Sequence, residues 1–356
     1  MTGPWSALLS QPSTWPLESS SQPVQLLRDV DAIPSALRGG AVSIGNFDGV
    51  HRGHARIVER LRRVGRELAG PAVVFSFDPH PVRLLRPEDA PPPLTWSERK
   101  AQLLSELGID ALIACRTDEQ LLSLSPEEFF ERIVRGRLQA RAVVEGPNFC
   151  FGRQRSGNVE VLRDLCGRAG LRLEIVEPLQ AGGEYVSSSR VRQLLREGRV
   201  DQANACLTRP YRIRGMVTHG DGRGAAIGFP TANLEAIDTL LPAAGVYAGR
   251  GMHAEGTWAA AIHVGPLPTF GQHGSRVEVH LLGFRGSLYG TVLEVDFVTR
   301  LRDIQPFPSA QALQAQLARD AEAARRAVQQ TDAQEGPSGQ RRDSPGRMPR
   351  QTTVAP

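Results

Sequence analysis

The segment that most constrains this chain is a glycine-rich loop between an apolar run and an amphipathic run, together spanning residues 41–68. The loop, residues 44–54, reads IGNFDGVHRGH. Glycines let the backbone adopt positive φ and approach a ligand closely. A helix after the loop would present free N–H groups, which suit a phosphate. His51 and His54 can hold charge or donate hydrogen bonds there. The segment therefore predicts a strand, loop and helix that form a nucleotide-phosphate site.

The length of the chain predicts about two domains, because 356 residues exceed one ordinary core. Its 40% hydrophobic and 22% charged residues are typical of a globular protein. The net charge is only +4 and the arginines are scattered, so we expect no nucleic-acid partner. Small anionic substrates such as ATP suit this charge balance.

The four cysteines lie at wide, irregular spacing, and the sequence has no CxxC pair or Cys/His metal motif. We therefore expect reduced thiols. The first 20 residues lack a basic start and an apolar core, and no apolar run approaches the length of about 18 residues that a membrane helix needs. These features predict a cytoplasmic protein with no membrane contact.

Short apolar runs alternate with helical patterns between residues 23 and 205, after a loosely ordered stretch at 1–22. Helices are expected over 54–68, from Ser97 to Gly108, and after a capping box at Ser125. Strands separated by helices indicate parallel βαβ units. The expected fold of this domain is an α/β doubly wound parallel sheet, Rossmann-like and covered on both faces. Its strands are predicted at 41–45, 71–77, 111–115, 140–145 and 171–177.

The pattern changes to short β segments with glycine-rich turns in the second domain, residues 206–327. Residues 277–281 alternate apolar and polar side chains, as a strand with one buried face does. We expect a small antiparallel β-barrel followed by a helix from Ser309 to about Ala327. The tail, 328–356, is rich in Gln, Arg, Pro, Gly and Ser and should be disordered. The expected barrel segments are 212–219, 245–249, 259–264, 277–284 and 291–298.

A serine cluster, Ser187, Ser188 and Ser189, precedes a helical pattern that carries Arg192. The simpler interpretation is an N-cap for that helix. A second interpretation places the hydroxyls, backbone N–H groups and Arg192 around a leaving pyrophosphate, since a guanidinium binds phosphate oxygens in pairs. Both interpretations can hold together.

The barrel domain carries a second glycine-rich stretch at 220–233, GDGRGAAIGFPTAN, which lacks the G-K-[ST] of a Walker loop. A turn-rich hairpin is the simpler interpretation. Alternatively, the loop covers phosphates, while the Thr231 hydroxyl and the Asn233 carbonyl supply oxygen ligands for Mg²⁺. Glu278 lies in the alternating strand, where a carboxylate usually faces solvent.

Taken in order, these motifs resemble a known enzyme family. Residues 45–54 resemble the nucleotidylyltransferase signature of bacterial FAD synthetases, and 75–81 (FSFDPHP), 94–100 (LTWSERK), 148–153 (NFCFGR) and 187–192 (SSSRVR) follow in the family's order. The run GFPTAN resembles the P-T-A-N motif of riboflavin kinases, and Glu278 matches their general base. From about residue 24 to 325 the chain is similar to the bifunctional riboflavin kinase/FAD synthetases.

The resemblance implies two ATP-dependent reactions, riboflavin to FMN and FMN to FAD, with Mg²⁺ as cofactor and riboflavin, FMN, FAD and ATP as ligands. Domain 23–205 would be the FMN adenylyltransferase, and domain 206–327 the riboflavin kinase. The residues implied in catalysis are Glu278, His51, His54 and Arg192. Those implied in binding ATP and phosphate for adenylylation are Gly45, Phe47, Asp48, Gly49, Gly53, Asn148, Ser187, Ser188 and Ser189. Those implied in the kinase are Gly222, Gly224, Gly228, Pro230, Thr231, Asn233 and Arg302, with Thr231 and Asn233 as magnesium ligands.

The chain departs from the family pattern at Ala225, at His263 and at residues 303–305. Two other interpretations therefore stay open. One is a nucleotidylyltransferase for another phosphorylated substrate, with a barrel that only binds. The other is a flavin- or nucleotide-binding regulatory protein that has lost one or both activities. Retention of both histidines, Arg192 and Glu278 favours the bifunctional enzyme.

Overall fold

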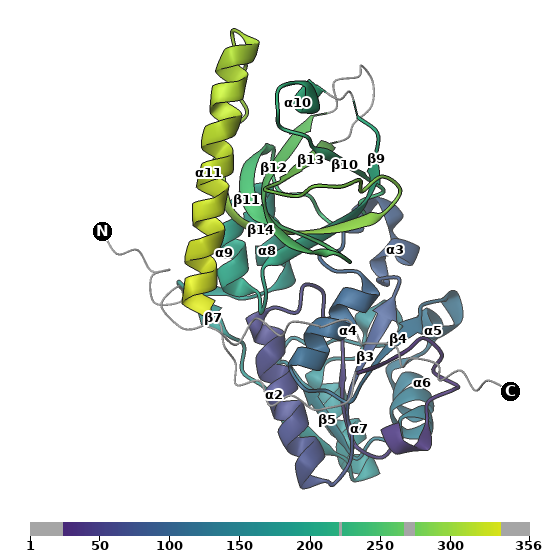
Figure 1. Ribbon diagram of the computed structural model, residues 1–356. Helices are drawn as coiled ribbons and strands as arrows, with labels where there is room; N and C mark the ends of the chain where they lie inside the picture. Colours follow the sequence, from purple (N-terminus) through teal and green to yellow (C-terminus); the bar gives the residue numbers. More distant parts are fainter. Residues whose placement is uncertain (1–23, 221–222, 267–274, 336–356) are drawn as a thin grey trace, which may run out of the picture.

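The computed structural model describes residues 24–220, 223–266 and 275–335. Its first part is a six-stranded sheet covered by helices, and its second part is a closed six-stranded barrel. The long helix α11 (Ala310–Glu335) lies along the barrel (Figure 1). This confirms the predicted fold class, a doubly wound sheet followed by a small barrel and a helix.

The sheet is parallel, and its strand order is β1-β4-β3-β2-β5-β6. The five strands expected from the sequence are present, and a three-residue edge strand, β1, precedes them. The chain adds β3 and β4 on one side of β2 and then β5 and β6 on the other. Such a change of direction is where doubly wound sheets bind ligands. The strands are β1 (Gln25–Leu27), β2 (Ala41–Ile44), β3 (Ala72–Asp78), β4 (Ala111–Arg116), β5 (Ala142–Glu145) and β6 (Arg172–Ile175).

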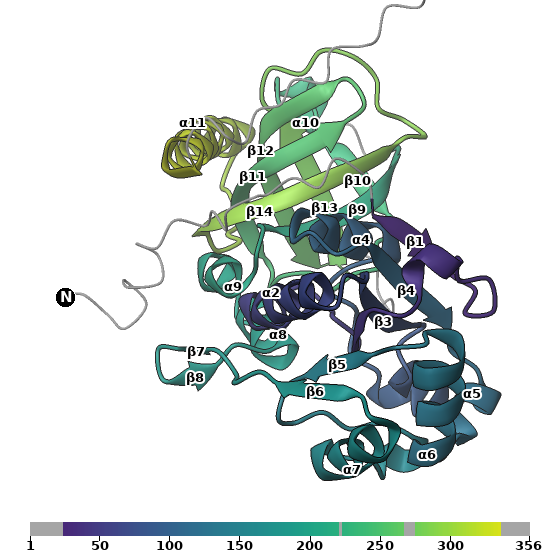
Figure 2. The same ribbon diagram turned by 90° about the horizontal axis from the view of Figure 1, so that it is seen from below.

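Helices cover both faces of this sheet (Figure 2). On one face, α2 (Arg52–Glu67) and α4 (Ser97–Glu106) bury apolar side chains such as Leu61 and Leu104. On the other, α6 (Pro126–Phe129), the continuing helix η3 (Phe130–Arg137) and α7 (Val159–Ala169) bury residues such as Phe130. Two covered faces explain why the strands read as continuous apolar runs.

The carboxyl group of Glu145 is buried at the ends of β2 and β5, the pair of strands at which the order of strand addition reverses. Ala41 pairs with Ala142 and Val42 with Val143, but the amide of Ile44 donates to Glu145 Oε1 at 2.5 Å. Burial raises the pKa of Glu145 well above its usual range, and its hydrogen bonds oppose that rise. Glu145 therefore takes a hydrogen bond that a backbone carbonyl would otherwise accept as the two strands end.

The barrel is closed in the order β10-β13-β12-β11-β14-β9, with antiparallel neighbours. Val277 and Val279 point into its core, while Glu278 and His280 point outward, as the alternation predicted. Strand β10 was not expected; it begins at the last two residues of the motif GFPTAN and continues two residues past it. The strands are β9 (Tyr211–Thr218), β10 (Ala232–Glu235), β11 (Gly245–His253), β12 (Gly256–Pro266), β13 (Ser275–Leu281) and β14 (Val292–Arg302).

Helix α11 is capped by Ser309, whose Oγ accepts from the amide of Ala312 at 3.2 Å. It continues to Glu335, so residues 328–335, which we assigned to a disordered tail, are helical. This stretch consists largely of strong helix formers, and no glycine or proline interrupts it before residue 336. Val328 is buried and Arg250 pairs with Asp332 at 2.5 Å, which holds this extension against the barrel.

The two parts of the fold share one interface and one apolar cluster. Leu94 of the first part packs with the barrel residue Tyr211 and with helices α8 (Ser188–Arg196) and α9 (Val200–Cys206). Arg209 pairs with Glu106 at 2.6 Å across the junction. Helix α9 spans the boundary that we placed at 205/206. The remaining elements are η1 (Ser35–Leu37), α3 (Val82–Leu85), η2 (Pro87–Asp89), α5 (Glu119–Ser123), η4 (Arg153–Arg155), β7 (Gln180–Ala181), β8 (Glu184–Tyr185) and α10 (Arg223–Ala226).

Among residues 24–220, 223–266 and 275–335, no helix has both the length and the apolarity needed to cross a bilayer.

Two candidate active sites

The glycine-rich loop after β2 places both histidines at the start of α2. His51 is the N-cap, and its Nδ1 accepts from the amide of His54 at 3.2 Å. The helix therefore begins at Arg52, two residues earlier than expected. The two imidazole rings are stacked, with centroids 3.6 Å apart and planes 16° apart. Gly53 lets them stack, because a Cβ there would lie 3.0 Å from His51 Nδ1.

Both histidines are neutral at pH 7. Burial and then the nearby Arg192 lower the pKa of His51 to about 3, and burial lowers the pKa of His54 well below its usual value. Because His51 Nδ1 accepts a hydrogen bond, the proton of the neutral ring lies on Nε2. His54 Nδ1 is buried without a hydrogen-bond partner among the described residues. The two histidines can therefore exchange hydrogen bonds with a ligand. They do not carry a positive charge, which the sequence analysis had allowed.

The depressed pKa of His51 predicts acid sensitivity. An unfolded chain protonates this histidine below pH 6.5, whereas the folded protein resists protonation down to about pH 3. The contribution of His51 to the free energy of unfolding is therefore fully present above pH 6.5 and is lost as the pH falls toward 3. His51→Asn keeps an N-cap oxygen but does not titrate. We expect it to reduce the loss of unfolding free energy between pH 7 and 4 by on the order of 2–3 kcal/mol, measured by urea denaturation. An unchanged pH dependence would contradict this assignment.

Asp48 joins the loop to two distant segments. Its carboxylate accepts from the amides of Leu94 and Thr95 at 3.0 and 3.1 Å and pairs with Arg192 of α8. Asp48 and Arg192 are each 7% exposed, so the ion pair is buried. A buried pair is costly to break from one side, because the remaining charge stays buried and unpaired. The predicted phosphate ligands Asp48 and Arg192 thus also hold the site together.

The serine cluster caps a helix, as the simpler interpretation predicted, and it also contacts the glycine loop. Ser187 caps α8 by accepting from the amide of Arg190 at 3.2 Å. Ser188 Oγ donates to the carbonyl of Asp48 at 2.9 Å, which fixes the start of α8 against the glycine loop. The Ser189 side chain forms no hydrogen bond with another described residue. Arg192 Nε also donates to the carbonyl of Pro92 at 3.0 Å.

Phe47 and Gly49 give the loop its shape, and Gly45 joins it to the sheet. Phe47 has φ of 47°, is buried, and its ring lies 4.8 Å from that of His54. Gly49 has φ of 82°, and a Cβ there would lie 2.9 Å from Leu94 Cδ1. The amide of Gly45 donates to the carbonyl of Phe75 at 2.9 Å. Positive φ at a non-glycine residue costs energy and is concentrated at functional sites.

A cavity of about 290 Å³ opens beside this loop, between the sheet and the barrel. Asp48 and Arg192 line it, as do residues that we did not assign to the site: Asn46, His80, Thr95, Lys100, Arg214 and Asp238. Lys100 is buried, its Nζ donates to Ser76 Oγ at 3.1 Å, and burial lowers its pKa. His80 Nε2 lies 2.8 Å from the Asn46 amide. His80 lies in the segment 75–81 and Lys100 in the segment 94–100, both of which resemble the family, so these two residues could have been selected from the sequence. Of the residues assigned to adenylylation, only Asp48 and Arg192 line this cavity; the two histidines, the loop glycines and the serine cluster lie beside it, and Asn148 is exposed in a turn after β5.

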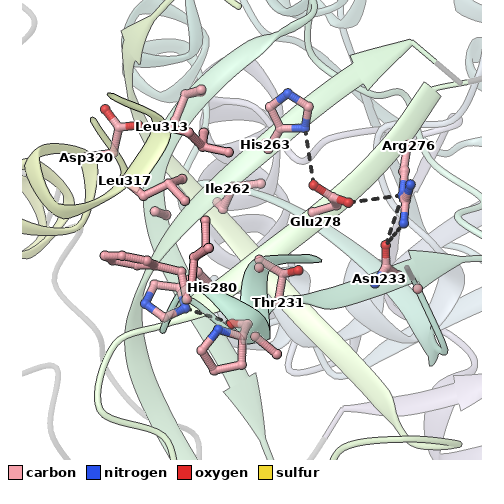
Figure 3. A pocket seen from close by; sticks show the side chains of 18 of the residues that line it. Thr231, Asn233, Ile262, His263, Arg276, Glu278, His280, Leu313, Leu317 and Asp320 are labelled. Carbon is pink, nitrogen blue, oxygen red and sulfur yellow. Dashed lines mark hydrogen bonds and ion pairs between the residues drawn. The ribbon is translucent and has the colours of Figure 1, made fainter. Parts of the chain in front are cut away.

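The second cavity, of about 370 Å³, lies on the outer face of the barrel under α11. Its floor comes from β10, β12 and β13, and Leu313, Leu317 and Asp320 of α11 form one wall (Figure 3). The predicted residues Gly224, Pro230, Thr231, Asn233, Glu278 and Arg302 all line it. The structure therefore brings residues from three separate motifs into one site.

Strand register explains why these residues meet. Asn233 pairs with Glu278, Glu278 pairs with His263, and His263 pairs with Val246. Residues paired in register point to the same face of a sheet. His263 Nδ1 lies 3.7 Å from Glu278 Oε2, so the departure from the family pattern at His263 lies next to the predicted base. Burial lowers the pKa of His263, while Glu278 opposes that effect.

Arg302 is anchored by the helix above the cavity. Its guanidinium forms a two-pronged ion pair with Asp320, with contacts of 2.7, 3.0 and 3.1 Å, and lies 5.6 Å from the centre of the Phe307 ring. Asp320 is almost fully buried. Such a pair fixes the guanidinium plane. Asp320 therefore holds Arg302 at the cavity wall.

The glycine loop above the cavity is described in part. Gly222 lies outside the described residues. Gly224 approaches the backbone closely, since a Cβ there would lie 2.4 Å from the Phe229 carbonyl, and Gly228 has φ of 87°. His280 Nδ1 lies 2.7 Å from the Pro230 carbonyl and ties the end of the loop to β13. The loop thus needs glycine for backbone reasons, and its end is fixed beside Thr231.

The donor set at this site suits Mg²⁺. Thr231 and Asn233 offer neutral oxygens at the edge of the cavity, and magnesium bound with ATP takes few protein ligands because phosphates and water complete its shell. No cluster of three or more His, Cys, Asp or Glu is found in the part of the chain that the structure describes, so a metal cage made of such side chains is not seen there. The Asn233 oxygen already accepts hydrogen bonds from Arg276.

Comparisons with known proteins find one family match in each part of the chain. The FAD synthetase family profile matches residues 33–190, and the riboflavin kinase profile matches residues 207–328. The bifunctional riboflavin kinase/FMN adenylyltransferase of Pseudomonas fluorescens is 36% identical over 303 residues, covering 85% of this chain and 97% of that protein. This chain belongs to the bifunctional riboflavin kinase/FMN adenylyltransferase family. The resemblance inferred from the motifs is therefore confirmed.

Other relatives in the family cover similar shares. The proteins of the same name from Escherichia coli K12 and Bacillus subtilis are 34% and 32% identical, covering 83% and 78% of this chain and 96% and 89% of theirs. A solved structure titled as a macrolide-efflux protein from Streptococcus pneumoniae superposes with a TM-score of 0.76 at 29% identity, covering 85% of this chain and 99% of that one. The similarity thus includes both parts of the fold.

Proposed function

We propose that this chain phosphorylates riboflavin to FMN in the barrel and then adenylylates FMN to FAD in the sheet domain, using ATP in both steps. One observation carries the proposal. Each half of the chain matches one enzyme family across its domain, and each half contains a cavity lined by that family's motif residues. Because both steps consume ATP, we propose that the protein works in the cytoplasm.

In the kinase step, Glu278 would take the proton from the terminal ribityl hydroxyl of riboflavin. The hydroxyl oxygen attacks the γ-phosphorus of ATP, and ADP leaves. The outward position of Glu278 between Asn233 and His263 supports this role, because the base then faces the cavity. Mg²⁺ held by Thr231 and Asn233 would neutralise phosphate charge.

In the adenylylation step, a phosphate oxygen of FMN attacks the α-phosphorus of a second ATP, and pyrophosphate leaves. This nucleophile is already ionised at neutral pH, so the step needs no protein base, and positioning and charge stabilisation must supply the catalysis. Neutral His51 and His54 would donate hydrogen bonds to phosphate oxygens, beside the free N–H groups that start α2. Ser188 and the buried Arg192–Asp48 pair would hold the cradle in shape and Arg192 would face the leaving group.

An incubation of the protein with riboflavin, ATP and Mg²⁺ tests the proposal, with the flavins separated by chromatography. We expect FMN to appear first and FAD to follow. FMN without FAD would overturn the adenylyltransferase assignment. Unchanged riboflavin would favour the alternative, a flavin-binding regulatory protein, and added FMN would then show whether adenylylation alone remains.

A further inference from the structure

Arg276 lies between the two residues on which the kinase proposal depends (Figure 3). Its Nε lies 3.1 Å from Glu278 Oε1, and its Nε and a terminal nitrogen donate to Asn233 Oδ1 at 2.9 and 2.8 Å. One guanidinium therefore connects the predicted base and a predicted metal ligand. Arg276 was not among the residues predicted from the sequence.

The chemistry of the contact identifies the oxygen of Asn233. A guanidinium has donors and no acceptor, so the atom that it contacts must be the carbonyl oxygen of the amide. The other end of the amide lies against Gly220, where a Cβ would come within 2.1 Å of Asn233 Nδ2. Asn233 is 9% exposed, so its amide is fixed between Gly220 and Arg276.

Arg276 and a metal ion would compete for the same oxygen of Asn233. The oxygen that Mg²⁺ would use already accepts two N–H groups of a permanent cation, and two cations on one oxygen repel each other. Resting on the proposed kinase function, we propose that Arg276 is a positioning residue that occupies the magnesium-ligating oxygen of Asn233. Entry of the metal with ATP requires the guanidinium to release that oxygen.

The proposal gives Arg276 two effects of opposite sign. Through Glu278 it holds the carboxylate toward the cavity, which favours catalysis. Through Asn233 it competes with the metal and so raises the metal concentration that the site needs. Loss of Arg276 should therefore tighten metal binding and slow the reaction. If Arg276 only supported the fold, its loss would weaken metal binding as well as slow the reaction.

Metal binding without turnover separates these effects. Mn²⁺, which accepts the oxygen ligands that magnesium uses, can be titrated by electron paramagnetic resonance in the presence of a non-hydrolysable ATP analogue. The proteins to compare are wild type, Arg276→Gln, Asn233→Ala and the double variant. This cycle isolates the coupling between the two side chains. Arg325→Gln is the control, since Arg325 pairs with Glu322 on the exposed side of α11.

We expect Arg276→Gln to bind Mn²⁺ about tenfold more tightly than wild type, the effect of about one charge-assisted hydrogen bond. The gain should vanish when Asn233 is replaced by alanine, and the control should match wild type. Equal or weaker binding by Arg276→Gln, or the same gain without Asn233, would overturn the proposal. If Arg276→Gln does not fold, Arg276→Met takes its place with the same expected gain, because methionine is similar in length and carries neither a charge nor an N–H donor.

The metal-binding experiment can fail or succeed independently of the proposed kinase activity. A wild-type protein that makes no FMN would refute the kinase activity, while the four-protein comparison would still decide whether Arg276 and the metal compete for Asn233.

Discussion

Glu278→Gln should lower the rate of FMN formation from riboflavin by about 10²–10⁴-fold, the usual contribution of a general base. Glutamine preserves the shape of the side chain and can still contact Arg276 and His263, but it cannot accept the proton of the ribityl hydroxyl. The measurement is the initial rate of FMN formation at saturating riboflavin and ATP. KM for ATP should change little, because the carboxylate acts on riboflavin.

The adenylyltransferase activity of Glu278→Gln serves as the internal control. FMN supplied directly should still be converted to FAD at the wild-type rate, since the sheet domain has a separate cavity. Glu235→Gln changes an exposed carboxylate on β10 and should leave both rates unchanged. Near-normal FMN formation by Glu278→Gln would remove Glu278 from the chemistry.

His54→Ala should lower FAD formation from FMN by about 10²–10³-fold, as the loss of one preorganised hydrogen-bond donor does. His54 stacks on His51 at the start of α2, and its Nδ1 is buried without a hydrogen-bond partner in the described residues. A ligand that hydrogen-bonds to this atom would satisfy a buried polar group. The rate is followed by chromatography with FMN and ATP as substrates.

Riboflavin phosphorylation is the internal control for His54→Ala and should be unchanged, so that FMN accumulates. His54→Asn keeps a side-chain donor and should recover part of the lost rate. If His54→Ala formed FAD at a near-normal rate, the assignment of the glycine loop as the adenylylation site would be wrong.

The elements with regular local patterns could be predicted from the sequence. Strand β13 was predictable because its apolar and polar residues alternate, and the covered strands of the sheet because they are continuous apolar runs. Strand β1 has only three residues, and β10 follows a turn-rich motif, so neither carries a clear period. The end of α11 was missed because its last turns have a mostly polar composition, which local patterns do not distinguish from a tail.

Motifs in the sequence suggested candidate site residues, but not the contacts among them. Arg192 and Glu278 line the two cavities, whereas His51 and His54 lie at the start of α2 beside the first cavity and do not line it. The pairing of Asp48 with Arg192 joins residues 144 positions apart, and the contact of Arg276 with Asn233 joins residues 43 positions apart. Such contacts depend on strand order and barrel closure, which no local period records. The neutrality of the two histidines likewise depends on burial in the folded chain.

We propose that this chain transfers the γ-phosphoryl group of one ATP to riboflavin and the adenylyl group of a second ATP to the FMN that forms. Labelled ATP distinguishes the two transfers. With riboflavin as substrate and Mg²⁺ present, we expect label from the γ-phosphate in both FMN and FAD, and label from the α-phosphate in FAD but not in FMN. FMN without the γ-label, or FAD without the α-label, would contradict it.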